Sequence, residues 1–350
     1  MRCKLMETRG LDARKRGRII SAKLGRSQDI SRSEKLFGPS ARHDKLRSMR
    51  ISVLLPSFNY ASYLPRALNS VLHQTFRDFE IIAADDGSTD GSWEILEQYA
   101  VQHPRHLRIL RHPQGRNRGI AATYRLAASA AKGEMLAFLE ADDSWHPECL
   151  EKRSAALRQF PEAGVAVSRY SPQGDPRGCL YWHFYQETNR LSLRSRRPQN
   201  TFGLYLVRNP AASFSHFMIR RNLFDAIADP SGRELYFDWW ILAHAAAVSD
   251  FIFLPERLSS WTIHTGSANF GPITYAKLRD LHRFTRELYD SVASLPMSEA
   301  RRKTLDKKRA RMLDYLGFFE GRALQVLLSE PYYGSRFLCH LALNRLLMNR

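Results

Sequence analysis

Cysteine is scarce in this sequence. The 350 residues contain four cysteines, and no two of them have C-x-x-C spacing: Cys3, Cys149, Cys179 and Cys339. This scarcity gives no support to a zinc site or to a disulfide framework. It is typical of a protein in a reducing compartment, so we expect a cytoplasmic location.

Long apolar runs are also missing. No run approaches the roughly 18 residues that a membrane-spanning helix needs. The basic N-terminal segment lacks the apolar core of a secretory signal. We therefore expect no membrane span, and any contact with the inner face of the cell membrane would be peripheral. The basic run 301–311 could meet anionic lipid in this way, or could be a solvated helix face.

Acidic residues are outnumbered, because 53 Lys and Arg face 35 Asp and Glu and the net charge is +18. This balance suggests an anionic partner, such as nucleic acid, a phosphorylated ligand or a membrane surface. Fifteen basic and five acidic residues fall within residues 1–50, so the remaining 300 carry only about +8 of the +18. We predict that residues 1–49 form a mobile basic tail, and a native start at Met49 stays open.

The hydrophobic share is 44 %, which is enough for a sizeable core. Apolar runs rich in β-branched residues alternate with helical periodicity from residue 51 onward. The pattern predicts strands and helices in turn: strands 51–56, 79–86, 107–112 and 134–140, and helices 62–74, 92–102 and 119–131. Such alternation indicates right-handed βαβ units, a parallel sheet and thus an α/β fold.

After Trp145 the alternation is looser. We predict a helix over 147–160, a short strand over 165–168 and a loop-rich segment over 171–212. A strand turning into a helix follows over 215–228. The pattern then predicts a helix over 237–247 and two strands, 250–255 and 258–264. From Tyr275 to the end it is helical, with breaks near Pro296 and Pro331.

Polar side chains follow two of the predicted strands. Asp85 and Asp86 could accept hydrogen bonds from a nucleotide base or ribose, because ligands of open α/β sheets bind at the carboxyl ends of strands. Alternatively, these residues and Ser88 form an Asx turn that caps the next helix. Phe58, at the end of the first strand, could stack on a base or be a core aromatic.

A dense acidic stretch follows the fourth predicted strand. Glu140, Asp142 and Asp143 could converge on one divalent cation, since hard cations such as Mg²⁺ prefer oxygen ligands. Alternatively, Asp143 or Ser144 caps the helix at Pro147, because acids favour helix N-termini. Three acids are more than a cap requires, so the sequence favours the metal site.

Two residues in the second half could also take part in chemistry. Asp238 stands in the segment FDWW, where burial among aromatics would raise its pKa and suit it as a general base. The alternative is a helix cap with core tryptophans. His264 follows a predicted strand and is either a metal ligand or a structural residue.

These segments, in their order along the chain, resemble glycosyltransferase family 2, the inverting enzymes of the GT-A fold. The resemblance rests on PSFN at 56–59, DDGSTD at 85–90, NRG at 117–119, Gly133–Glu134, and EADD at 140–143. It is good over residues 50–150 and weaker to about 270. It does not cover the tail or the last 75 residues.

The resemblance implies a GT-A (nucleotide-diphospho-sugar transferase) fold. Its mostly parallel central sheet would be flanked by helices and followed by a C-terminal helical extension. It implies donor binding by residues 50–145, acceptor binding by 146–270 and a helical region over 271–350. The reaction would move a UDP- or dTDP-linked sugar to a glycan or lipid-linked glycan, in cell-surface polysaccharide or lipopolysaccharide synthesis. A divalent metal, Mn²⁺ or Mg²⁺, would assist.

The resemblance also implies residue roles. Nucleotide-sugar binding falls to Pro56, Phe58, Asn59, Asp85, Asp86, Arg118, Glu140 and Asp142, with Asp86 or Asp85 on the uracil or thymine ring. Metal binding falls to Asp142, Asp143 and His264, with either aspartate as the direct ligand. Asp238 falls at the position of the catalytic base. The segment W-x-I-H-x-x-x-x-N, which ends at Asn269, is similar to one in rhamnosyltransferase-like members.

Two residues depart from the family pattern. Glu140 stands where the first Asp of D-x-D is usual, and it keeps the charge while moving it by about 1.5 Å at most. We expect the site to survive this change. Thr262 stands where those rhamnosyltransferase-like members have Arg, which removes a possible cation for the diphosphate.

Two other classes of protein share some of these sequence features. A nucleotidyltransferase also binds nucleotides at the end of a parallel sheet, but it would carry a Gly-rich basic loop directly after the first strand, where this chain has PSFNYASYL. A nucleic-acid or membrane module would fit the net charge. The charge concentrates in the tail, however, and no nucleic-acid-binding signature appears, so we expect no specific nucleic acid.

Overall fold

The computed structural model describes residues 50–190, 196–229, 236–264 and 275–319. Within them, eight strands form one sheet in the order β3-β2-β1-β4-β7-β6-β8-β5. Their bounds are β1 Ile51–Ser57, β2 Phe79–Asp85, β3 Leu107–Arg111, β4 Met135–Phe138, β5 Ser144–Trp145, β6 Ala163–Gly174, β7 Phe217–Arg220 and β8 Asp250–Ile263. The first four strands are parallel, as are β6 and β8, whereas β7 and β5 run antiparallel to their neighbours. The prediction of a mostly parallel sheet is confirmed.

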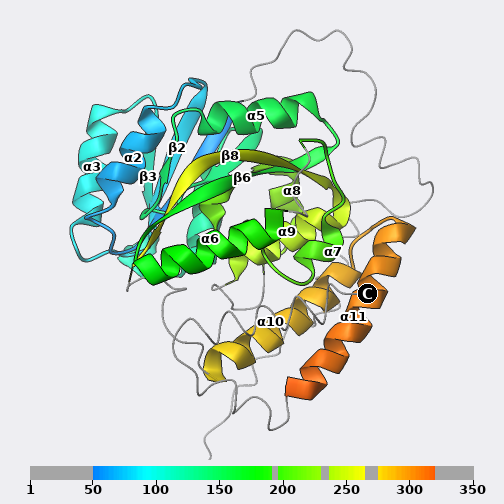
Figure 1. The fold of residues 1–350 in the computed structure, drawn as a ribbon. Helices are drawn as coiled ribbons and strands as arrows, with labels where there is room; N and C mark the ends of the chain where they lie inside the picture. Colours follow the sequence, from blue (N-terminus) through cyan, green and yellow to red (C-terminus); the bar gives the residue numbers. More distant parts are fainter. Residues whose placement is uncertain (1–49, 191–195, 230–235, 265–274, 320–350) are drawn as a thin grey trace, which may run out of the picture. The chain divides into compact units, whose positions relative to one another are not determined.

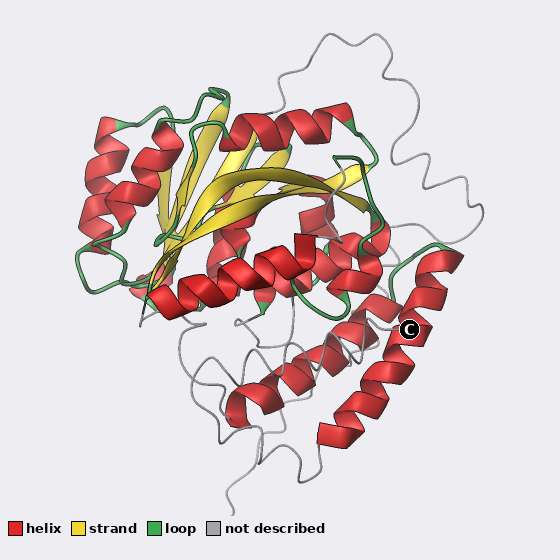
Figure 2. Cartoon of the chain, in the orientation of Figure 1, coloured by secondary structure: helices red, strands yellow, loops and turns green. Residues whose placement is uncertain are grey.

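Helices cover both faces of this sheet (Figures 1 and 2). Side chains alternate along the central strands, so Val53 and Leu55 face one core whereas Leu54 faces the other. One core is closed by α2 (Leu64–Leu72), α3 (Ser92–Gln102) and α5 (Cys149–Gln159). The other is closed by α4 (Ile120–Ala130), α7 (Phe202–Tyr205), α8 (Arg221–Ala226), α9 (Phe237–Val248) and α10 (Tyr275–Ala293).

The elements up to residue 160 agree with the predicted ones within a few residues. Pro56 lies inside the central strand β1, where a residue without an N–H group is usually excluded. It is tolerated because the pairing with β4 ends at Leu54 and Phe138, so that Pro56 is paired only with β2. Strands from residues 50–145 and 146–270 share the sheet through the β4–β7 and β5–β8 pairs. Their division into donor and acceptor halves stays a prediction.

The prediction of a loop-rich segment over 171–212 is wrong. β6 continues to Gly174, and α6 spans Pro176–Arg190. Helix α6 lacks a clear polar–apolar period because an aromatic cluster anchors it: Trp182 lies against Trp261 of β8, with ring centroids 4.5 Å apart. Those partners are far apart in the sequence, so the local pattern carried no sign of the helix.

The two strands predicted over 250–255 and 258–264 are one strand, β8. Leu254 is paired with Ser168 and Arg257 with Arg169, so the register shifts around Pro255 and Glu256. A bulge of this kind lets a strand continue past a proline, which cannot donate to the ladder.

The C-terminal helical extension is confirmed as α10 and α11 (Glu299–Phe319), which are separated near Pro296. The predicted break at Pro331 and the tail 1–49 lie outside the described residues, as do Cys3 and Cys339. Cys149 and Cys179 are free thiols. Across the described part of the chain, every helix is too short or too polar to cross a membrane.

The basic run 301–311 is partly structural. Arg301 donates to the carbonyl oxygens of Ala246 and Ser249, each at 3.1 Å, and to Asp250 Oδ1 at 2.5 Å. Arg302 donates to the carbonyl of Ala293 at 2.7 Å. These arginines therefore satisfy carbonyl groups at the C-terminal ends of α9 and α10, which carry partial negative charge. For Arg301 and Arg302, therefore, neither the lipid-contact alternative nor the solvated-face alternative holds.

We expect Arg301→Ala to lower the free energy of unfolding by about 2–3 kcal/mol, because it removes hydrogen bonds from a charged donor that is only 15 % exposed. Lys303→Ala is the matched control, since Lys303 is 76 % exposed and its ion-pair partner within the described ranges is Glu299 on the same helix. It should change stability by less than about 0.5 kcal/mol. Urea unfolding measures both, and equal effects would contradict this role of Arg301.

Candidate functional site

The site lies where β1, β2 and β4 end. These strands are parallel, so their carboxyl ends meet at one edge of the sheet. The pairing of Ser57 with Asp85 places the segment after β1 next to the segment after β2. This geometry brings PSFN, DDGSTD and EADD together, as the sequence predicted.

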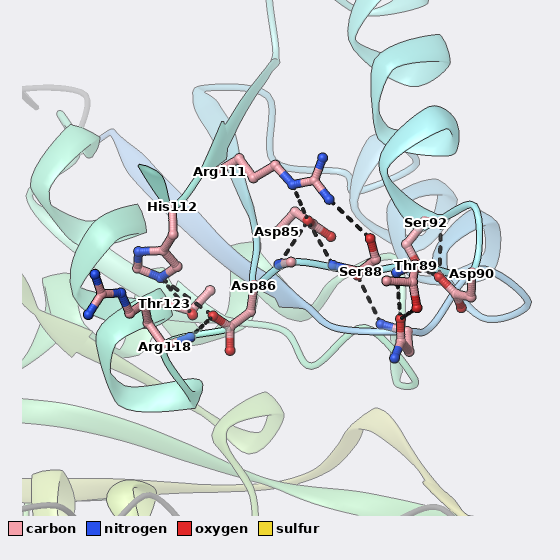
Figure 3. A network of polar contacts seen from close by, with 12 residues as sticks. Asp85, Asp86, Ser88, Thr89, Asp90, Ser92, Arg111, His112, Arg118 and Thr123 are labelled. Carbon is pink, nitrogen blue, oxygen red and sulfur yellow. Dashed lines mark hydrogen bonds and ion pairs between the residues drawn. The ribbon is translucent and has the colours of Figure 1, made fainter. Parts of the chain in front are cut away.

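Asp85 has a structural position. It is fully buried, and its Oδ1 accepts the N–H groups of Gly87 at 3.0 Å and Ser88 at 3.1 Å and lies 3.0 Å from Arg111 Nε. Figure 3 shows this network. The Asx-turn alternative is thereby confirmed for Asp85. The contact at the start of the next helix is made by Asp90, whose Oδ1 accepts the N–H of Ser92 at 3.0 Å.

Asp86 binds the segment that precedes α4. Its two carboxylate oxygens accept the backbone N–H groups of Arg118 at 2.6 Å and Gly119 at 2.8 Å (Figure 3). The two segments approach closely at Gly87, where a Cβ would lie 2.4 Å from the carbonyl oxygen of Gly115. Asp86 thus anchors a basic loop whose Arg118 is exposed at this edge. Its contact with a nucleobase stays a prediction.

The PSFN segment presents one aromatic ring. Phe58 is 42 % exposed, so the core-aromatic alternative is wrong and the ring is accessible for stacking. Asn59 adopts a φ of 56° in the left-handed region, which Asn tolerates better than most residues. Its Oδ1 accepts the N–H of Thr89 at 2.8 Å, and its own N–H donates to Ser88 Oγ at 2.9 Å. Asn59 therefore joins the loops after β1 and β2.

The three acids after β4 converge. Oxygen atoms of Glu140, Asp142 and Asp143 all lie within 4.8 Å of one another. Asp143 Oδ1 accepts the N–H of Thr262 at 2.9 Å, whereas its buried Oδ2 has no hydrogen-bond partner in the described part of the chain. Among the described residues, no side chain caps α5, which begins at Cys149. The capping alternative for Asp143 and Ser144 is therefore wrong.

Burial and repulsion by neighbouring carboxylates raise the pKa values of Glu140 and Asp143. The pKa of Glu140 rises to about 8, first because of burial and then because of Asp142, although Ser213 donates to it at 2.7 Å. The pKa of Asp143 is raised well above its usual range by burial and by the charges of Asp142 and Glu140. A cation among these groups would favour their charged forms. The orphaned Asp143 Oδ2 and the all-oxygen donor set fit a hard divalent metal.

His264 lies at the same cluster. Its Nε2 is 3.1 Å from Asp142 Oδ2, and its ring stacks on Tyr63 with centroids 5.0 Å apart. The structure thus brings together the three predicted metal ligands. Asn269, from the same sequence motif, lies outside the described residues.

Asp238 lies in the first turn of α9. Its Oδ2 accepts from Asn209 Nδ2 at 2.7 Å, and its Oδ1 accepts the N–H of Trp239 at 2.7 Å. Burial raises the pKa of Asp238 to about 7. Its charge in turn contributes to the raised pKa of Glu140, which indicates that the two carboxyl groups share one environment. The N-cap of α9 is Tyr236, and no side chain among the described residues caps this helix, so the helix-cap alternative for Asp238 is wrong. Its role as a general base stays a prediction.

Sequence reasoning missed several residues of this site. Asn209, which donates to Asp238, falls in the segment predicted to be loop-rich, and Ser213, which donates to Glu140, directly follows it. Arg66 donates to Thr262 Oγ1 at 2.5 Å. A guanidinium therefore lies beside Thr262, the position at which rhamnosyltransferase-like members have Arg. No signal in the sequence links residues that lie 196 positions apart.

The fold and this acidic edge define an α/β protein of the GT-A type. Residues 52–227 match the family model described as glycosyl transferase family 2. The chain belongs to this family.

One relative and two solved structures illustrate the likeness. An uncharacterized glycosyltransferase of Nostoc sp. is 43 % identical over 117 residues, which are 33 % of this chain and only 35 % of that relative. Residues 1–349 of Staphylococcus aureus TarS, solved with UDP, match 81 % of this chain and 76 % of theirs at 19 % identity, with a TM-score of 0.55. The mannosyltransferase PcManGT of Pyrobaculum calidifontis, solved with GDP-Man and Mn²⁺, matches 90 % and 86 % at 16 % identity, with a TM-score of 0.56. The predicted GT-A fold is confirmed, whereas the rhamnosyltransferase-like subgroup stays a prediction.

Proposed function

We propose that this chain is a metal-dependent, inverting glycosyltransferase. It would move a sugar from a UDP- or dTDP-linked donor to an acceptor hydroxyl, in cell-surface polysaccharide or lipopolysaccharide synthesis on a glycan or lipid-linked glycan. The observation that carries the proposal is the presence of two acidic groups that interact electrostatically. One is the cluster of Glu140, Asp142 and Asp143, and the other is Asp238, with a pKa of about 7.

The donor would lie along the carboxyl ends of β1 and β2. The exposed Phe58 ring offers a stacking surface for the base, and the loop anchored by Asp86 brings the exposed Arg118 to the same edge. The TarS complex with UDP and the mannosyltransferase complex with GDP-Man support nucleotide binding on this fold. Asp85, which is buried in its turn, would act by shaping the loop, so Asp86 is the better candidate for contact with the base.

The metal would be held by Asp142, Asp143 and His264, with Glu140 beside them. The unpartnered Asp143 Oδ2 and the raised pKa values of Glu140 and Asp143 support this assignment, as does the Mn²⁺ in the mannosyltransferase complex. When bound, a divalent cation stabilises the negative charge on a departing diphosphate.

Asp238 would act as the general base. Asn209 donates to Oδ2 and the Trp239 N–H donates to Oδ1, so the carboxylate has a fixed orientation. As the acceptor oxygen forms its bond to the anomeric carbon, its proton passes to Asp238, and the bond to the diphosphate breaks with its electron pair on the phosphate oxygen. Attack from the face opposite the diphosphate inverts the configuration. A base with a pKa near ambient pH is suited to this proton transfer.

A thermal-shift panel of UDP-, dTDP- and GDP-linked sugars, with and without Mn²⁺, tests the proposal. We expect sugars of one nucleotide class to raise the Tm only when Mn²⁺ is present. At a ligand concentration of 100 Kd, binding should add about 2.7 kcal/mol to the free energy of unfolding. Nucleoside monophosphates with Mn²⁺ are the control, because they lack the diphosphate. A panel without any metal-dependent shift would contradict the proposal. Release of pyrophosphate from a nucleoside triphosphate would point instead to a nucleotidyltransferase.

A further inference from the structure

A single nitrogen of Arg66 joins three elements of the chain. Arg66 lies on α2, and its Nη2 donates to the backbone carbonyl of Asp142 after β4 and to Thr262 Oγ1 on β8. The contact with Thr262 is 2.5 Å long. The guanidinium therefore ties the acidic loop and the end of β8 to the same helix.

Both elements that Arg66 holds carry predicted metal ligands. The Thr262 N–H donates to Asp143 Oδ1 at 2.9 Å, and His264, two residues further on, lies 3.1 Å from Asp142 Oδ2. Tyr63 precedes Arg66 by one helical turn, and its ring stacks on His264. The first turn of α2 thus contacts both the acidic loop and the end of β8.

The acidic loop needs such a restraint. The pairing of β4 with β1 ends at Phe138, and the Leu139 N–H makes the last bond to β1, to the Leu54 carbonyl at 3.0 Å, so residues 140–143 are outside the sheet ladder. Three carboxyl groups within 4.8 Å repel one another when charged, which favours a wider spacing of the loop. In the part of the chain that the structure describes, the Asp142 carbonyl has Arg66 as its hydrogen-bond partner. Removing the Arg66 guanidinium would therefore release the loop at Asp142, whose carboxylate lies next to His264.

We propose that Arg66 is a positioning residue that sets the spacing of Asp142, Asp143 and His264 by latching their two segments to α2. The inference rests on the proposed function for its metal, whereas the latch itself is a property of the protein without a ligand. Arg66 acts through the backbone of Asp142 and the hydroxyl of Thr262. Partners of this kind, which orient metal ligands, typically change metal affinity or activity about 10- to 100-fold when they are replaced.

The test compares Arg66→Met, which keeps an unbranched stem but removes every donor, with Arg66→Lys and with Arg283→Met. Arg283 is the matched control, since it is an exposed helical arginine whose ion-pair partner among the described residues is Asp280, at 3.2 Å. Titration with Mn²⁺ alone, followed by electron paramagnetic resonance, gives the metal affinity. We expect Arg66→Met to weaken Mn²⁺ binding about 10- to 100-fold and Arg66→Lys to restore part of it. The control should bind as the wild type does.

Hydrogen exchange of the backbone amides over 139–144, without metal, is the second readout. We expect faster exchange there in Arg66→Met and unchanged exchange over β1 and β2, so that a general loss of folding is distinguished from a released loop. Wild-type Mn²⁺ affinity together with wild-type exchange in Arg66→Met would overturn the latch. Absence of Mn²⁺ binding in the wild type would instead count against the proposed function, while the exchange measurement would still decide the latch.

Discussion

Replacing Asp238 by Asn should lower kcat by about 10²- to 10⁴-fold, the usual contribution of a general base. The amide has the same shape and keeps an oxygen for Asn209, but it cannot take a proton from the acceptor hydroxyl. The donor would be bound along the carboxyl ends of β1 and β2 and not by Asp238, so the KM of the donor should change little. Transfer assays with the donor identified by the thermal-shift panel measure both constants.

The pH profile gives a second measure of the same role. Because burial raises the pKa of Asp238 to about 7, the wild-type rate should rise with pH and level off above about 7 as the carboxyl group loses its proton. Asp238→Asn should lose this rise. Asp290→Asn is the control, since Asp290 is an exposed residue of α10 that pairs with Arg309. Near wild-type transfer by Asp238→Asn at saturating donor and acceptor would exclude Asp238 as the base.

Replacing Asp143 by Asn should abolish the response to Mn²⁺ and yet stabilise the protein without metal. The folded-state pKa of Asp143 is raised, so the folded protein binds its proton more tightly than the unfolded chain does. Its contribution to stability is therefore present at low pH and is lost as the pH rises. Glu140 behaves in the same way, and because its pKa rises from 4.5 to about 8, its own contribution is lost between those values.

Charge repulsion sets the size of the effect. Two carboxylates about 4.8 Å apart repel by roughly 3 kcal/mol at an effective dielectric constant of 20. Asp143→Asn removes such a pair and keeps an oxygen for the Thr262 N–H. We expect its Tm at pH 8 without metal to exceed the wild-type value by several degrees, at about 2–4 °C per kcal/mol. With Mn²⁺ the order should reverse.

Scanning calorimetry at pH 5 and pH 8, with Mn²⁺ and with chelator, measures these differences. In chelator, the Tm of the wild type should decrease more from pH 5 to pH 8 than the Tm of Asp143→Asn does. The exposed Asp290→Asn should follow the wild type under all four conditions. A variant at Asp143 that still gains stability from Mn²⁺ would show that Asp143 is not a ligand.

The first hundred described residues could be predicted because their signals are local. The strands β1, β2 and β4 are apolar runs buried along their whole length, and each helix has an apolar stripe that its own sequence displays. Parallel strands bring their carboxyl ends to one edge, so the convergence of Phe58, Asp85 and the acids after β4 followed from strand order alone.

The part that could not be predicted depends on partners distant in the sequence. Helix α6 is held by Trp261, and β8 passes Pro255 only because β6 accommodates a bulge. Asp85 and Asp86 are chemically identical neighbours. Only their hydrogen bonds distinguish them. Asp85 accepts from Gly87 and Ser88 and is a buried turn residue, whereas Asp86 accepts from Arg118 and Gly119 and anchors a loop.

The sequence by itself determined the fold class, the family and the identity of the acidic groups, because short motifs at strand ends and hydrophobic periodicity are properties of neighbouring residues. Tertiary structure alone decided which of those groups share a site and what holds them there. Arg66 and Thr262 meet at Asp142 and Asp143, and Asn209 meets Asp238, only after the chain has packed. The spacing and pKa of a carboxylate depend on burial and neighbouring charge, and both come from packing.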